Sequence, residues 1–136
     1  MKTVMAFGSF DILHPGHLYF LNQAKSKGDK LVVVIALDKT IEKVKGEKPK
    51  YNERQRLEHV KGMPMVDKAV LGYEKDTYEI IEEINPDVIC LGYDQDSYSE
   101  NLKEKLAERG INPEIIRLGP YKEDIYKSSK LKQHLQ

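Results

Sequence analysis

The sequence has one cysteine and no tryptophan among its 136 residues. A single cysteine excludes an intramolecular disulfide, so a hydrophobic core has to hold the chain together, and a chain of this length can form one. The cysteine, Cys90, lies inside the apolar run Val88-Ile89-Cys90-Leu91, which is typical of a buried strand. We therefore interpret it as a core thiol and not as a nucleophile.

Long apolar runs and an excess of one charge are also missing. No stretch approaches the ~20 residues that a bilayer span needs, and the first apolar run ends at Gly8 and Ser9, unlike a signal peptide. The 22 basic residues balance 22 acidic ones, which argues against a dedicated nucleic-acid binder. We expect a cytoplasmic protein that binds neither nucleic acid nor a membrane.

Five short apolar runs alternate with segments of helical pattern. The runs are 3–7, 31–37, 66–71, 87–91 and 114–118, and helices are expected at 16–27, 52–61, 77–84, 100–109 and 128–135. The second run is apolar on both faces, as in a central strand of a covered parallel sheet. The pattern predicts one Rossmann-like α/β domain over residues 1–136, with a five-stranded parallel sheet and helices on both faces.

Short local patterns predict where helices begin and end. Gly28 and Gly110 stand where C-terminal caps belong. Asp76 with Glu79 gives a capping-box pattern. Asn85-Pro86 then predicts the end of the same helix.

Glycine turns follow three of the expected strands, at 71–74, 91–94 and 118–121. The carboxyl ends of parallel strands meet at one edge of the sheet, and in open α/β folds that edge carries the ligand crevice. The alternative is that each glycine merely ends a strand. Three such turns on one edge favour a ligand site there.

The segment 8–17, Gly-Ser-Phe-Asp-Ile-Leu-His-Pro-Gly-His, joins the first strand to the first helix. Pro15 and Gly16 predict a helix beginning near His17, whose free N–H groups and positive dipole end suit a phosphate. Three interpretations of His14 and His17 are then open. They are helix-start residues that bind nothing, or they are metal ligands, or they donate to phosphate oxygens. Neither a cysteine nor a clustered third histidine completes a zinc site. The pattern H-P-G-H in a first strand-to-helix turn favours phosphate.

These motifs carry a family resemblance. Gly8-Ser9-Phe10-Asp11 with 14–17 resembles the cytidylyltransferase-like nucleotidyltransferases, whose usual forms are G-T-F-D and H-x-G-H. The segments 91–95, Leu-Gly-Tyr-Asp-Gln, and 126–131, Tyr-Lys-Ser-Ser-Lys-Leu, resemble the archaeal FAD synthase branch, in which ATP adenylylates FMN. The sister glycerol-3-phosphate cytidylyltransferase branch typically has Trp where this chain has Gln95.

The resemblance implies a set of site residues. It assigns catalytic roles to His14, His17 and Lys45. It assigns phosphate contacts to Arg56 and Lys127. The residues that would contact the nucleotide are Ser9, Phe10, His14, Gly16, His17, Asp94, Tyr126, Ser128 and Ser129. Phe10 would pack on the nucleotide. A solvated basic loop is the alternative for Lys43 and Lys45, and an exposed helical position is the alternative for Arg56. His59 and His134 are interpreted as surface or packing residues.

Two positions depart from the family pattern. Ser9 replaces the usual threonine and keeps its hydroxyl, and Lys127 stands where serine is more frequent, in the run that holds the β- and γ-phosphates.

The resemblance also implies the reaction. An acceptor phosphate attacks the α-phosphorus of a nucleoside triphosphate bound with Mg²⁺, and pyrophosphate leaves. A phosphate monoester has a second pKa near ~6 and needs no general base at pH 7. We expect ATP and FMN to give FAD. Tyr73, Tyr93, Tyr98, Tyr121 and Tyr126 fall in or near the turns at the ligand edge, where they suit a flat flavin ring.

Other assignments stay open on the sequence alone. One is a cytidylyltransferase or adenylyltransferase acting on glycerol 3-phosphate or a sugar phosphate. Another is a non-catalytic nucleotide-binding module, against which the histidine pair counts. A homodimer is expected, with Met63-Pro64-Met65 either in its interface or in the core.

Overall fold

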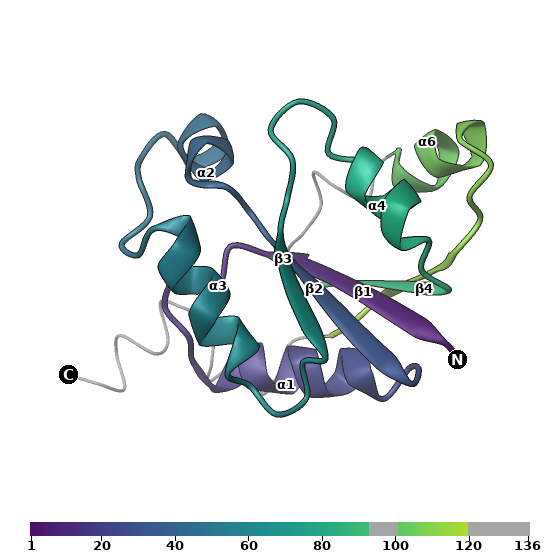
Figure 1. Ribbon diagram of the computed structural model, residues 1–136, viewed down its shortest axis with the longest axis horizontal. Coiled ribbons are helices and arrows are strands. Elements are labelled where there is room, and N and C mark those ends of the chain that lie inside the picture. The colour runs from purple at the N-terminus through teal and green to yellow at the C-terminus, as the bar shows by residue number, and fades with distance from the viewer. Residues whose placement is uncertain (93–100, 120–136) are drawn as a thin grey trace.

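The computed structural model describes residues 1–92 and 101–119 (Figure 1). Within them lies a five-stranded sheet with the order β3-β2-β1-β4-β5, and every neighbouring pair is parallel. The strands are β1 (Thr3–Gly8), β2 (Lys30–Ile35), β3 (Lys68–Leu71), β4 (Val88–Leu91) and β5 (Glu114–Arg117). This confirms the predicted single Rossmann-like α/β fold.

Helices cover both faces of the sheet. They are α1 (Pro15–Lys25), α2 (Asp38–Lys45), α3 (Glu53–Lys61), α4 (Glu79–Ile84) and α6 (Leu102–Glu108). In Figure 1, α1 and α3 lie on one face and α4 and α6 on the other. The helix expected at 128–135 lies outside the described residues. Helix α2 was not predicted, because only Ile41 and Val44 in it are apolar and only Ile41 is buried.

The core forms two clusters, one on each side of the sheet. Along β1, Val4 and Ala6 pack with the side of α1 and α3, while Met5 and Phe7 pack with the side of α4 and α6. This alternation is the period of two that a strand buried on both faces requires. Cys90 is fully buried in the first cluster, and burial raises the pKa of its thiol to about 11. The interpretation of Cys90 as a core thiol is confirmed.

Two of the predicted helix ends are confirmed. Gly110 follows α6 with φ 77°, in the left-handed region that glycine tolerates best. Asn85 ends α4 with φ 48°.

Of the two other end signals, the one at Gly28 was wrong and the one at Asp76 is confirmed in part. Helix α1 already ends at Lys25, and a Cβ on Gly28 would lie 2.8 Å from the Lys2 carbonyl oxygen. Glycine is therefore needed there for close approach and not as a cap. The Asp76 carboxylate interacts with the Tyr78 N–H and the Glu79 N–H just before α4 begins, which is the half of the predicted capping box that forms.

The apolar segment after α3 belongs to the core. Met63 is buried and Met65 packs against the same cluster. Across residues 1–92 and 101–119, each helix is too short or too polar to cross a membrane.

The strand order changes direction at one point of the sheet, beside β1. β1 lies between β2 and β4, and α1, which follows β1, lies on the opposite face from α6, which follows β4. At such a switch point the connecting segments diverge and leave a crevice at the carboxyl ends of the strands. The segment after β1 enters α1 at this point.

Candidate functional site

His14 caps the first helix. Its Nδ1 accepts from the Gly16 N–H at 3.0 Å, and Nδ1 of His17 accepts from the His14 N–H at 3.3 Å. Both amides belong to the helix start, where the helix itself offers no acceptor. The helix begins at Pro15, two residues before the predicted start, because His14 is the cap and His17 completes a reciprocal capping box.

These bonds fix the tautomer of both imidazoles. A ring whose Nδ1 accepts a hydrogen bond carries its proton on Nε2 when neutral. Burial lowers the pKa of His14. The pKa of His17 falls to about 4, first through burial and then through the charges of His14 and Lys45. Both rings are therefore neutral at pH 7, with Nε2–H as the remaining donor.

Two glycines make room for rings in this turn. A Cβ on Gly16 would lie 2.7 Å from Cε1 and 2.9 Å from Nδ1 of His14. A Cβ on Gly8 would lie 2.5 Å from Cε2 of Phe10. Glycine at these positions lets the His14 ring lie over the helix start and the Phe10 ring fold back on β1.

Phe10 does not present its ring to a ligand. It has a positive φ of 50°, its side chain is 3% exposed, and it belongs to the core. The ring meets His17 edge-on, with centroids 5.4 Å apart. The expectation that this ring packs on a nucleotide was wrong, since the left-handed backbone turns it inward.

A hollow opens beside the motif, between the segment after β1 and the end of α2. Ser9, Asp11, Ile41, Lys45, Glu47, Lys48 and Pro49 line it. Lys45 is the last residue of α2, and its charge reaches His17. Lys43 is exposed and does not line the hollow. Of the two lysines singled out in the sequence, Lys45 is the one that faces the motif.

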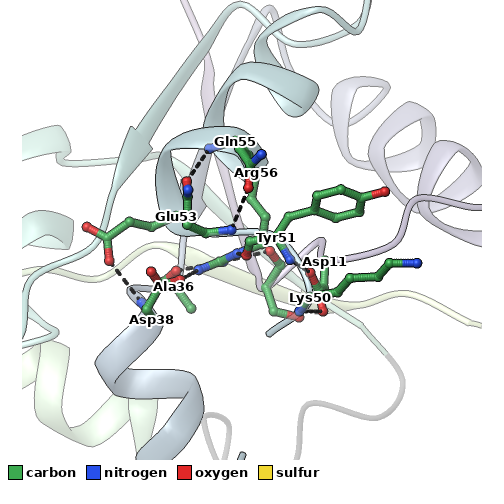
Figure 2. A network of polar contacts seen from close by, with 10 residues as sticks. Asp11, Ala36, Asp38, Lys50, Tyr51, Glu53, Gln55 and Arg56 are labelled. Carbon is green, nitrogen blue, oxygen red and sulfur yellow. Dashed lines mark hydrogen bonds and ion pairs between the residues drawn. The ribbon is translucent and has the colours of Figure 1, made fainter. Parts of the chain in front are cut away.

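Arg56 is the one fully buried charged residue in the described ranges. Its Nη1 donates to the carbonyl oxygens of Ser9 (2.9 Å) and Ala36 (2.7 Å), and its Nε to that of Tyr51 (3.0 Å). Its Nη2 pairs with Asp38 at 2.7 Å (Figure 2).

This geometry corrects both interpretations of Arg56. The residue is not an exposed helical position, because its side chain has no exposed surface. The guanidinium is also directed at protein acceptors where the ends of β1 and β2 converge, so it is not presented to a phosphate.

Asp11 joins the motif to the loop after α2. Its Oδ2 accepts from the Lys50 N–H at 2.7 Å and its Oδ1 from the Tyr51 N–H at 2.8 Å (Figure 2). Sequence reasoning placed Asp11 in the motif without a role, since only the folded chain brings these amides, about 40 residues away in sequence, to its carboxylate. Asp38 and Glu53 were missed for the same reason, and Lys48, which lines the hollow, was interpreted only as part of a solvated basic loop.

Several expected site residues fall outside the described residues. They are Asp94, Tyr126, Lys127, Ser128 and Ser129, together with Tyr93, Tyr98, Tyr121 and His134. Tyr73 is described: it follows β3, is 36% exposed, and donates to Glu83. His59 is exposed on α3 and meets Tyr51 edge-on, which agrees with a surface or packing role. Over 1–92 and 101–119, no three His, Cys, Asp or Glu side chains gather as a metal site.

This chain is similar to known proteins over most of its length. The cytidylyltransferase-like family model matches residues 5–134. A FAD synthase of Methanosarcina barkeri is 48% identical over 90% of this chain and 87% of its own. One of Thermococcus sibiricus is 46% identical over 97% and 90%.

A solved structure is also similar. It is titled a lipopolysaccharide core biosynthesis protein, from Thermoplasma volcanium. It is 42% identical to this chain with a TM-score of 0.84, over 89% of this chain and 98% of its own.

Proposed function

The chain belongs to the cytidylyltransferase-like family and is a nucleotidyltransferase, and on that premise we propose that it transfers the adenylyl group of ATP to FMN. The products are FAD and pyrophosphate. Relatives named FAD synthase, each matched over most of both chains, support the choice of substrates.

The observation that carries the reaction is the histidine pair at the start of α1. Two neutral Nε2–H donors lie at the start of α1, at the carboxyl end of β1, and the charge of Lys45 reaches His17. Such donors stabilise charge that develops on a transferring phosphoryl group, and they need no reorganisation as the reaction proceeds. A neutral donor also avoids the desolvation cost of a buried imidazolium.

In the proposed step an FMN phosphate oxygen attacks the α-phosphorus of ATP. A new P–O bond forms as the bond to the β-phosphate oxygen breaks, and pyrophosphate takes the electron pair. The attacking phosphate is mostly ionised at pH 7, so no side chain has to remove a proton. The roles left to the protein are to align two anions and to bind the charge on the α-phosphate. We assign these roles to His14, His17 and Lys45.

Nucleotidyltransferases of this kind generally use a divalent cation, and we propose Mg²⁺. Magnesium in phosphoryl-transfer sites is usually held by substrate phosphates and waters with one or two carboxylates. We propose that it arrives with the triphosphate and offsets its charge.

The test is a product screen with Mg²⁺. The protein is incubated with ATP or CTP and with FMN or glycerol 3-phosphate, in all four combinations, and products are identified by mass. We expect FAD and pyrophosphate only from the combination of ATP with FMN. We also expect ATP to raise the melting temperature more than CTP does at equal concentration. Turnover of glycerol 3-phosphate with no FAD would contradict the flavin assignment and keep the reaction class.

We propose a homodimer, the commonest closed assembly, and a cytoplasmic location, in keeping with a core whose one cysteine is a free thiol. Light scattering that gives a single species at the 15.7 kDa of one chain would contradict the dimer.

A further inference from the structure

Helix α2 has very little apolar anchoring. It buries one residue, Ile41, while Val44 is 72% exposed. One buried side chain does not fix the orientation of a helix, because helix position normally depends on a whole apolar face. The place of Lys45, at the last position of α2, therefore depends on the polar contacts at the two ends of the helix.

The amino end of α2 is hydrogen-bonded to α3. The Asp38 N–H donates to Oε1 of Glu53 at 3.0 Å, which supplies the acceptor that Leu37, the cap residue, lacks. The Asp38 carboxylate accepts from Arg56 at 2.7 Å. Both partners belong to α3, which packs against the sheet.

The second end is tied to the motif. Gly46 ends α2 with φ 81°, and the chain returns through an exposed loop to Lys50 and Tyr51. The backbone amides of those two residues donate to Asp11. Asp11 lies three residues before His14 and lines the same hollow as Lys45. One carboxylate therefore connects the segment that carries the histidines to the loop that follows Lys45.

We infer that Asp11, supported by Arg56, is a positioning residue that holds Lys45 beside His14 and His17 during nucleotidyl transfer. Asp11 contacts backbone amides and touches no reacting group. The inference rests on the proposed function, since it assigns Lys45 to the charge on the transferring phosphate. A shift of about 1 Å in a group that meets that charge costs ~10²-fold in rate.

The contact requires a carboxylate. Each oxygen of Asp11 accepts one amide. An asparagine has one oxygen, so its NH₂ group would face the second amide donor to donor. D11N therefore loosens the loop with almost no change of shape. D11S is a second variant, with one acceptor and no opposed amide group.

The experiment is a double-mutant cycle on the rate of FAD formation. The variants are D11N, K45M and the double variant, with D87N as the control. Asp87 also accepts a backbone amide, that of Thr3 at 2.8 Å, but at the amino end of β1. We expect kcat to fall ~10²-fold in K45M and at least ~10-fold in D11N. D87N should keep the wild-type kcat, whatever its melting temperature.

The decisive readout is non-additivity. If Asp11 acts through Lys45, D11N should lower kcat less than ~3-fold in the K45M background, because residues that act as one unit are not additive. If the fold-losses in kcat of D11N and K45M multiply in the double variant, the inference is overturned. Full activity of K45M or of D11N would also overturn it. Rates are compared at a temperature where melting curves show every variant folded. D11S takes the place of D11N if D11N does not fold.

The two proposals fail in different ways. A wild-type protein that makes no FAD contradicts the proposed function, and the positioning role with it. A wild-type protein that makes FAD, with D11N and D11S at the same kcat, contradicts the positioning role alone.

Discussion

The imidazole of His17 accepts the backbone N–H of His14, and the two rings lie with centroids 4.0 Å apart. His14 in turn accepts the N–H of Gly16. This chain of acceptors leaves each neutral ring one donor, Nε2–H. Two imidazolium rings this close would repel each other, so the arrangement is stable in the neutral form, which is the form that donates to an anion without added charge.

Removing either histidine should affect the rate more than the fold. We expect H14A and H17A each to lower kcat by ~10²–10³, the usual cost of one donor aimed at transition-state charge. Loss of the His14 cap adds about 1 kcal/mol of destabilisation. H59A, on the exposed side of α3, is the control and should keep the wild-type kcat. Near-normal turnover of both variants would contradict the assigned roles.

Stability should depend on pH through His17. Its folded pKa is about 4 against an ordinary value of 6.5. Between these values the unfolded chain binds a proton that the native protein does not, so stability rises with pH. We expect the free energy of unfolding to fall as pH drops from 6.5 towards 4. Urea titrations at pH 7, 6 and 5 should show a shallower decline in H17N. Equal slopes for the two proteins would show that His17 is not the responsible group.

Alanine substitutions at Gly16 and Gly28 should have different effects, the first on kcat and the second on the melting temperature. Alanine at Gly16 places a Cβ 2.7 Å from the His14 ring, so the ring must move. We expect G16A to lower kcat at least ~10-fold, although alanine favours a helix by about 1 kcal/mol over glycine.

G28A is the matched variant at the other end of α1. Its Cβ would lie 2.7 Å from Cγ2 of Val4 and 2.8 Å from the Lys2 carbonyl oxygen, away from the histidines. We expect a lower melting temperature and an unchanged kcat. A full kcat in G16A would show that the His14 ring does not need its present place.

Arg56 should be a stability residue with a large effect. R56M leaves three backbone carbonyls and the Asp38 carboxylate without their buried donor. A third of the Asp38 side chain is exposed, so the cost comes mainly from the carbonyls that lose their donor, about 1–3 kcal/mol for each buried group. R54M changes an exposed arginine of the same helix and should stay within about 0.5 kcal/mol of wild type in chemical unfolding. A small effect of R56M would mean that water replaces the guanidinium.

Much of the fold follows from local patterns in the sequence. The run 31–37 predicted a strand buried on both faces, and β2 lies in the sheet between β1 and β3 with Val33 in one core cluster and Val34 in the other. The glycine turns predicted the carboxyl edge, and H-P-G-H predicted a histidine-bearing helix start there. These patterns work because strand alternation, caps and turns depend on residues a few positions apart.

The sequence alone determined the parallel α/β fold, the family and the histidine pair. The tertiary structure decided what Arg56, Phe10, Asp11 and α2 do. An arginine in a short polar helix reads as exposed until two strand ends bring their carbonyls to it. Phe10 turns inward because its φ is 50°, and Asp11 finds its donors far along the chain. Contacts of this kind have no local period, since they depend on where distant backbone groups converge.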